Sequence, residues 1–169
     1  YFYFVDIILL MFHNDIHIDI HHIHLLFHSI HMVNNIPNIF YYFDDLNVSF
    51  KDNKSHTIES YMVKFENEDF KVVYTSDVGT TNFDRLIEFC KDSDLLICES
   101  SLLRVDHSTI NTHLRAIEAG ILARESNSKK LLLTHFWPEH GKELYLEEAK
   151  EVFDNVEVAE EGKKLVLRR

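Results

Sequence analysis

The segment Val72-Val73-Tyr74-Thr75-Ser76-Asp77-Val78-Gly79 decides the fold, because a β-type apolar run ends there at a carboxylate and a glycine. The four residues before Ser76 predict a strand, and Gly79 predicts a tight turn. The preceding apolar run, 61–65, is joined to this segment by Asn67-Glu68-Asp69, which predicts a hairpin. The sequence therefore places Asp77 at the carboxyl end of a strand.

Elements on either side complete an alternating pattern. Two continuous apolar runs, 95–98 and 131–134, predict buried strands. Apolar residues at helical spacing predict helices that begin near residues 82, 114 and 142. Two short runs, 156–159 and 164–167, lie around Glu161-Gly162 and predict a second hairpin at the C-terminal end. Strands that alternate with helices indicate a layered α/β domain.

Polar residues follow the predicted strands directly. In open α/β sheets, ligands gather at the carboxyl ends of strands. Asp77, Glu99 and His135 hold such positions, His56 lies just before the strand at 61, and His113 opens a helix. Two histidines and a carboxylate form a ligand set that zinc or manganese accepts. Each residue also has a structural explanation: a packed histidine, a turn aspartate, or a solvated strand-end carboxylate at Glu99.

Four motifs in this region resemble those of a known family. In chain order they are His56-Thr57-Ile58-Glu59-Ser60-Tyr61, Tyr74-Thr75-Ser76-Asp77-Val78-Gly79, His113-Leu114-Arg115-Ala116-Ile117-Glu118-Ala119-Gly120 and Leu131-Leu132-Leu133-Thr134-His135-Phe136. Together they resemble segments of the metallo-β-lactamase-fold metallohydrolases, and most of all those of the ribonuclease Z-like branch. The resemblance runs from about Asn38 to Leu167 and covers the C-terminal half of that fold.

The resemblance implies an α/β fold of the metallo-β-lactamase type, an αββα sandwich that is incomplete at its N-terminus. It implies that His56 and His135 each bind one metal ion and that Asp77 bridges the two. The expected cofactor is Zn²⁺, as one or two ions, with Mn²⁺ as the alternative. A metal-bound hydroxide would be the nucleophile. Asp77 and His113 would be catalytic, with His113 as a general acid or oxyanion stabiliser, and Glu99 would orient a histidine.

The N-terminal segment reads differently from the rest. Seven of the twelve histidines lie between His13 and His31, so we divide the chain into an atypical His-rich segment, 1–37, and a metallo-β-lactamase-fold C-terminal half, 38–169. The family's H-x-H-x-D-H motif is not intact, and its nearest counterpart is His17-Ile18-Asp19-Ile20-His21-His22. Three explanations stay open: a rearranged loop in which His17, Asp19, His21 and His22 bind metal, adventitious metal-binding low complexity, or sequence from outside the family.

The expected function is a metal-dependent, phosphodiesterase-like hydrolase of this superfamily. Two alternatives stand beside it. One is a tRNA 3′-processing endonuclease of the ribonuclease Z type. The other is a catalytically inactive fragment with an incomplete metal site, because loss of ligands weakens metal binding. The formal net charge of −11 repels phosphate backbones, so a nucleic-acid partner is disfavoured but not excluded, and a small-molecule or phosphodiester substrate is expected.

Composition also bears on location and assembly. Cys90 and Cys98 lie in apolar runs, which indicates reduced core thiols and a cytoplasmic protein. The apolar run Ile7–Phe12 is far shorter than the roughly 20 residues of a membrane span. No basic segment precedes that run, so neither membrane association nor a signal peptide is expected. An exposed sheet edge, where the other half of the fold would pack, favours a homodimer.

Overall fold

The computed structural model describes residues 46–56, 60–107, 111–160 and 162–167, together with the backbone of the strands at 8–12, 15–19 and 40–43. These residues fall into two compact units. The smaller unit combines Tyr1–Ile36 with Ala159–Arg169, and the larger unit is Pro37–Val158. The division into 1–37 and 38–169 that the composition indicates stays a prediction. Within the described residues, no helix combines the length and the apolar character that a membrane span needs.

The smaller unit contains an antiparallel sheet of order β1-β2-β10. Its strands are β1 (Ile8–Phe12), β2 (Asp15–Asp19) and β10 (Lys164–Leu167). His17 and Asp19 lie on β2, where His17 is paired with Leu10 on one side and with Val166 on the other. His21 and His22 lie outside the described residues. For this tract the structure therefore gives a strand register and no ligand geometry.

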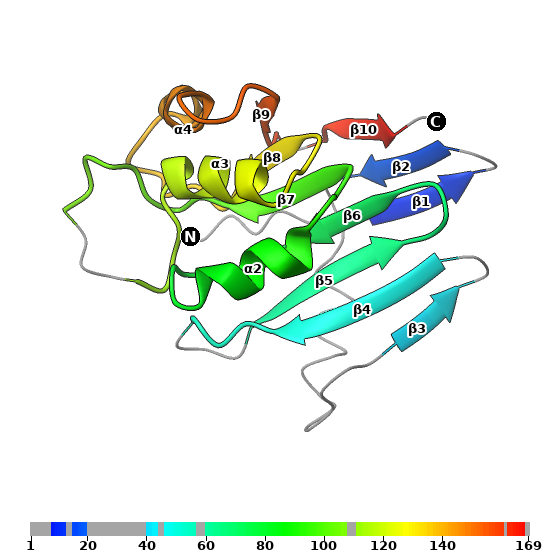
Figure 1. Cartoon of the computed structure of the whole chain (residues 1–169). Coiled ribbons are helices and arrows are strands. Elements are labelled where there is room, and N and C mark those ends of the chain that lie inside the picture. The colour runs from blue at the N-terminus through cyan, green and yellow to red at the C-terminus, as the bar shows by residue number, and fades with distance from the viewer. Residues whose placement is uncertain are drawn as a thin grey trace. The chain divides into compact units, whose positions relative to one another are not determined.

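The larger unit contains a seven-stranded sheet of order β3-β4-β5-β6-β7-β8-β9 (Figure 1). Strands β3 to β6 pair antiparallel with their neighbours, and strands β6 to β9 pair parallel, so β6 belongs to both parts of the sheet. The strands are β3 (Phe40–Phe43), β4 (Leu46–Asp52), β5 (Tyr61–Glu66), β6 (Lys71–Tyr74), β7 (Leu95–Glu99), β8 (Leu131–Thr134) and β9 (Val156–Val158). The predicted hairpin of β5 and β6 and the mixed α/β fold class are confirmed.

The second predicted hairpin, at the C-terminal end, is wrong. β9 pairs with β8 in parallel, whereas β10 pairs with β2. The reason lies in α4 (Lys142–Lys150), which separates β8 from β9 along the chain. A helix between two strands serves as the crossover that parallel pairing requires. Apolar runs as short as these do not indicate which strand they pair with, so the sequence could not distinguish a hairpin of β9 and β10 from pairing with other strands.

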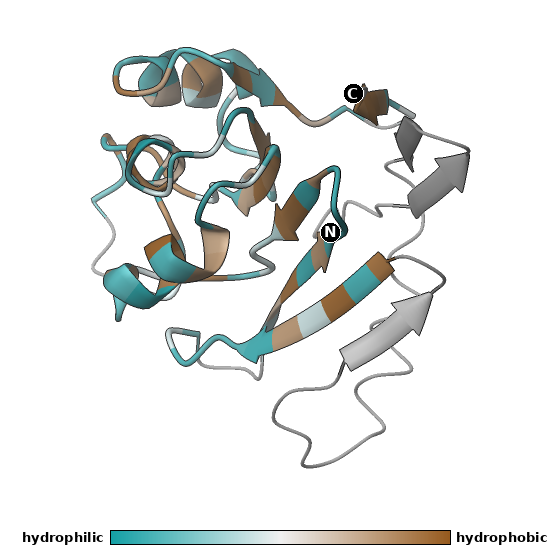
Figure 2. Cartoon of the chain, turned by 45° about the vertical axis from the view of Figure 1, so that its right-hand side comes forward, coloured by the Kyte–Doolittle hydropathy of each residue, from teal (hydrophilic) through white to brown (hydrophobic). Residues whose placement is uncertain are grey.

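Burial explains why the parallel strands have continuous apolar sequences. Every side chain of β7 and of β8 is buried, as is usual for parallel strands that are covered on both faces. On one face, Val73, Leu96 and Leu131 join the core with α2 (Phe83–Cys90), α3 (Ala116–Glu125) and α4, and these helices lie over that face (Figure 1). β4, in the antiparallel part, instead alternates apolar and polar residues (Figure 2).

Both cysteines belong to this core. Cys90 and Cys98 are free thiols with no exposed surface. Burial raises the pKa of the Cys90 thiol to about 12 and that of Cys98 well above its ordinary value. A thiol that stays protonated is a poor nucleophile and a poor metal ligand. The two residues therefore act as apolar packing groups, as their sequence context indicates.

Helices α3 and α4 approach each other at Gly120. A Cβ atom at this position would lie 2.8 Å from the carbonyl oxygen of Ala149 and 2.7 Å from Cγ2 of Val152. The first contact is with backbone, which cannot turn away as a side chain can. A residue larger than glycine therefore forces the two helices apart.

We predict that Gly120→Val lowers the free energy of unfolding by about 1–3 kcal/mol, the usual cost of overpacking a core. Chemical denaturation followed by circular dichroism measures the change. The matched control is Arg124→Val, because Arg124 lies exposed in the same helix and its ion pair with Glu125 is exposed as well. Equal stability of the two variants would show that the helix contact tolerates a side chain at 120.

Candidate metal centre

Parallel pairing brings three of the candidate residues to one edge of the sheet. β6, β7 and β8 are neighbours, with Tyr74 paired to Ile97 and Glu99 paired to Thr134. Their carboxyl ends therefore lie side by side. Asp77 lies three residues beyond the end of β6, Glu99 is the last residue of β7, and His135 directly follows β8.

Two residues at this edge have a left-handed backbone. Ser76 has φ of 54° and His135 has φ of 58°. This conformation is uncommon for residues other than glycine, and it persists where the surroundings hold it in place. At both positions it turns the chain out of the strand direction at the point where a candidate ligand leaves the sheet.

Glu99 is the most enclosed polar group of the site, with only 1% of its surface exposed. Its Oε1 accepts a hydrogen bond from the N–H of Val78 (3.0 Å) and lies 2.9 Å from Nδ1 of His113. Its Oε2 accepts hydrogen bonds from the N–H (3.1 Å) and the hydroxyl (2.8 Å) of Ser101. The explanation of Glu99 as a solvated carboxylate is therefore wrong.

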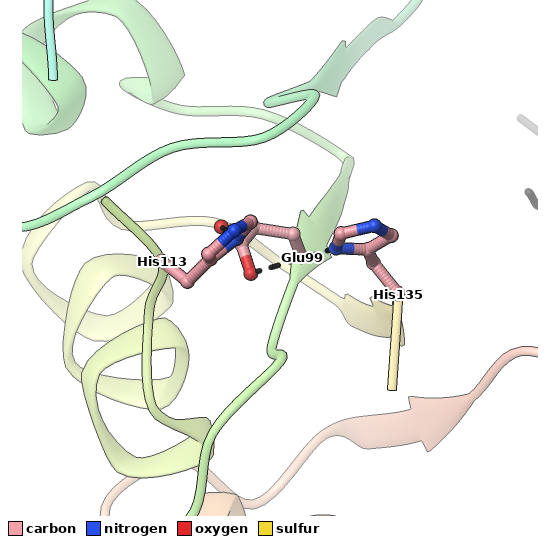
Figure 3. A group of neighbouring side chains, drawn as sticks. All are labelled: Glu99, His113 and His135. Carbon is pink, nitrogen blue, oxygen red and sulfur yellow. Dashed lines mark hydrogen bonds and ion pairs between the residues drawn. The ribbon is translucent and has the colours of Figure 1, made fainter. Parts of the chain in front are cut away.

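The charge of Glu99 depends on the two histidines beside it, and Figure 3 shows the three side chains together. Burial by itself raises the pKa of Glu99. The hydrogen bond with His113 and the positive charge of both histidines outweigh that effect, and the net pKa lies below the ordinary carboxyl value. For His135, burial lowers the pKa, but the nearby negative charges of Asp77 and Glu99 raise it overall.

Five candidate residues converge at this edge. Ligand atoms of Glu99, His113 and His135 all lie within 4.8 Å of one another. Oδ1 of Asp77 lies 3.5 Å from Nδ1 of His135, and the ring of His56 packs edge-on against that of His113 at 5.0 Å between centroids. Histidine nitrogens and carboxylate oxygens are the donor set that zinc and manganese accept, so the described residues fit a divalent cation.

Not every member of this group is equally free to bind a cation. An ionised carboxylate has about four lone-pair positions, and Glu99 faces four protein partners, two at each oxygen. Asp77 is different, because 32% of its side chain is exposed. The geometry therefore favours Asp77 over Glu99 as the carboxylate that meets a cation.

Backbone contacts hold the segments that carry His56 and Asp77 together. The side-chain N–H of Asn53 donates to the carbonyl of Asp77 at 2.5 Å, and the hydroxyl of Ser60 donates to the same oxygen at 2.8 Å. Two residues further along, the N–H of Gly79 donates to Oγ of Ser55 at 2.8 Å. Asn53, Ser55 and Ser60 thus support the Asp77 loop.

The expected reason for Gly79 is wrong. Its backbone is not left-handed, so no tight turn requires glycine here. A Cβ atom at this position would instead lie 1.8 Å from the carbonyl oxygen of Asn111, and the N–H of Thr80 donates to that same oxygen at 3.2 Å. Glycine permits the close approach of the segment that leads into His113.

The structure places the predicted site residues in two groups. His56, Asp77, Glu99, His113 and His135 come together in the larger unit. His17 and Asp19 belong to β2 of the smaller unit, and their side chains are not described, while His21 and His22 lie outside the described residues. The assigned metal and catalytic roles stay predictions.

Sequence reasoning missed the hydroxyl and amide groups of the site. Ser101 contacts Glu99, His113 and His135, and Asn53 holds the Asp77 loop. The available signal was the pair Ser100-Ser101, which directly follows the buried strand and Glu99. No comparable signal marked Asn53, which lies in a polar stretch.

We predict that Glu99→Gln destabilises the chain at neutral pH by about 1–3 kcal/mol, because an amide cannot accept hydrogen bonds at both of its terminal atoms. The depressed pKa of Glu99 stabilises the fold above the ordinary carboxyl pKa of about 4.3. That contribution disappears as the pH falls through the lowered value. As the pH falls from neutral to below the ordinary carboxyl pKa of about 4.3, the wild type should therefore lose more stability than the variant.

Denaturation at a series of pH values measures this difference, with the exposed Glu125→Gln as the control. Parallel stability curves for the wild type and Glu99→Gln would contradict the prediction.

Comparison with known proteins gives partial matches. No family profile matches the chain. It is 41% identical over 95 residues to ribonuclease Z of Archaeoglobus fulgidus, a match that covers 54% of this chain and 30% of the relative. It is 37% identical over 109 residues to YhfI of Bacillus subtilis, named as a metallo-hydrolase, which covers 63% of this chain and 43% of the relative. The chain thus matches less than half the length of these curated relatives.

Solved structures agree with these matches. The crystal structure of the metallo-β-lactamase fold protein YhfI from Bacillus subtilis superposes with a TM-score of 0.71 and 27% identity, over 79% of this chain and 55% of that chain. The short form of human tRNase Z gives a TM-score of 0.59 with 21% identity, over 74% and 43% of the two chains. The chain therefore has the metallo-β-lactamase fold, over a part consistent with its C-terminal half, and its sequence is similar to those of the ribonuclease Z-like metallohydrolases.

Proposed function

We propose that this chain is a metal-dependent hydrolase that cleaves phosphodiester bonds. The observation that carries the proposal is the juxtaposition of an accessible carboxylate and a histidine, Asp77 and His135, with the buried pair of Glu99 and His113. The first pair suits a cation, and the second suits proton transfer. Similarity to ribonuclease Z and to a metallo-hydrolase supports the same reaction class.

Asp77, His135 and His56 are the residues that would hold a divalent cation. Such a cation would lower the pKa of water and so supply a nucleophile near neutral pH, and it would offset the negative charge of a phosphodiester. Asp77 is held at its backbone by Asn53 and Ser60. Its carboxylate therefore needs little reorganisation when a ligand arrives, and pre-organisation of this kind strengthens binding.

His113 is placed to move a proton. Its Nδ1 lies against Glu99 Oε1, and an ionised carboxylate can only accept, so Nδ1 carries the hydrogen. The other ring nitrogen, Nε2, is then the atom that holds or releases a proton during the reaction. Glu99 orients the ring. This arrangement suits a general acid that protonates the leaving oxygen.

A second candidate is a tRNA 3′-processing endonuclease. Relatives named ribonuclease Z favour it, including that of Clostridium perfringens, which is 37% identical over 113 residues. The net charge of −11 opposes it, because a polyanion is repelled by an acidic surface. Cleavage of a tRNA precursor against that of bis-p-nitrophenyl phosphate separates the two candidates. A cytoplasmic location and a homodimer stay predictions from the sequence.

We predict that the purified chain binds zinc and that Asp77→Asn loses most of it, because a ligand charge disappears at nearly constant volume. Plasma emission spectrometry after dialysis measures the metal content. The matched control is Asp84→Asn, an exposed aspartate of α2, and His17→Ala tests the histidine-rich tract. Metal loss in His17→Ala alone would assign the metal to that tract. A wild-type chain without zinc would sink the proposal and leave an inactive fragment.

We predict that His113→Gln lowers the rate of bis-p-nitrophenyl phosphate hydrolysis by about 10²–10⁴-fold, the usual contribution of a general acid. Zinc content should stay at the wild-type level, since His113 is assigned to proton transfer. The control is His107→Gln, because His107 is exposed. Loss of zinc in His113→Gln would instead make His113 a ligand.

A further inference from the structure

We infer that Ser101 is a positioning residue whose hydroxyl fixes the ring tautomer of His135, so that Nε2 is the nitrogen left with a lone pair for a divalent cation. The inference rests on the proposed metal-dependent function. Ser101 is not one of the residues that the sequence motifs single out as candidates. The inference follows from which atoms donate and which accept in the hydrogen bonds among Ser101, Glu99 and His135.

The Ser101 hydroxyl has one hydrogen, and it donates this hydrogen in a hydrogen bond to Glu99. Oε2 of Glu99 lies 2.8 Å from Oγ of Ser101 and also accepts the N–H of the same residue at 3.1 Å. Oε1 accepts the N–H of Val78. A carboxylate that accepts backbone N–H groups at both oxygens acts as the acceptor toward the hydroxyl as well.

The same hydroxyl oxygen is then left to accept. Nδ1 of His135 lies 2.9 Å from it, so the hydrogen of that contact comes from the ring. With the Ser101 hydrogen on Glu99, an Nδ1 without a hydrogen would face Oγ of Ser101 at 2.9 Å, Asp77 Oδ1 at 3.5 Å and Glu99 Oε2 at 4.0 Å. None of these contacts would then contain a hydrogen, and such a meeting of acceptors is costly.

A neutral imidazole carries only one N–H, so a hydrogen on Nδ1 leaves a lone pair on Nε2. Metal-binding histidines commonly donate their other N–H to a neighbouring acceptor, which fixes both the tautomer and the ring orientation. In this chain the acceptor is a serine hydroxyl, and the carboxylate of Glu99 acts on His135 through it.

The position of Ser101 is itself well fixed. It has no exposed surface, its N–H is bound by Glu99, and its carbonyl accepts the hydroxyl of Tyr145 at 3.2 Å. The next residue, Leu102, pairs with Arg115 in a parallel bridge beside the segment of His113. Oγ also lies 3.3 Å from Nδ1 of His113. One hydroxyl therefore contacts both histidines and the carboxylate between them.

Long-range proton–nitrogen correlation NMR of the metal-free full chain tests the inference directly, because it reports which ring nitrogen carries the hydrogen. For the wild type at alkaline pH, where the His135 ring is neutral, His135 should be the Nδ1–H tautomer. In Ser101→Ala, His135 should become a mixture of tautomers. Zinc affinity, measured by titration with zinc chloride, should fall by about 10–100-fold, the usual effect of losing such a partner.

Two further variants separate positioning from packing. Ser101→Thr keeps the hydroxyl and should restore both the tautomer and most of the affinity. Ser100→Ala removes a neighbouring buried hydroxyl, which contacts only the carbonyl of Thr134 at 3.4 Å in the described contacts, and should leave both readouts unchanged. An Nε2–H tautomer in the wild type would overturn the inference, as would an unaltered tautomer in Ser101→Ala. Absence of zinc binding by the wild type would defeat the proposed function while the tautomer measurement still decided the role of Ser101.

Discussion

The site depends on one buried carboxylate. Removing a charged carboxylate from water costs several kcal/mol unless hydrogen bonds replace the lost solvation, and Glu99 meets this requirement with partners from three parts of the chain. Val78 belongs to the loop after β6, Ser101 follows β7, and His113 precedes α3. Because the carboxylate requires all of them, it holds three otherwise separate loops in one arrangement. It is thus a structural centre and an electrostatic one at the same time.

The two carboxylates of the site have different surroundings. Glu99 is enclosed and hydrogen-bonded at both oxygens, whereas Asp77 is part-exposed and is held mainly through its backbone carbonyl. An enclosed carboxylate orients neighbouring rings, and an accessible one can meet a cation or a substrate. The two histidines differ in the same way: His113 touches Glu99 directly, while His135 reaches it through the hydroxyl of Ser101. The proposed separation of proton transfer from cation binding rests on these contacts.

The supporting layer explains features that appear unrelated to chemistry. Because Gly79 has no side chain, the backbone at Asn111 can approach it closely. His113, two residues after Asn111, then lies within hydrogen-bond distance of Glu99. Left-handed backbone at Ser76 and His135 redirects two strand ends toward the same volume. Local strain of this kind is stable only when surrounding contacts maintain it. Here those contacts come from Asn53, Ser60 and Ser101.

The sequence by itself determined the strands, the helices and the residues that stand at strand ends. Apolar runs and helical spacing are local properties, so they marked β6, β7, β8 and the three helices, and with them Asp77, Glu99 and His135. Only the tertiary structure decided which strand pairs with β9 or β10, why residue 79 is glycine, and that Ser101 lies between two histidines. Those facts join residues far apart along the chain, and the contacts of Ser101 with the two histidines already span 12 and 34 positions. They depend on parallel register and loop packing, which no short stretch of sequence encodes.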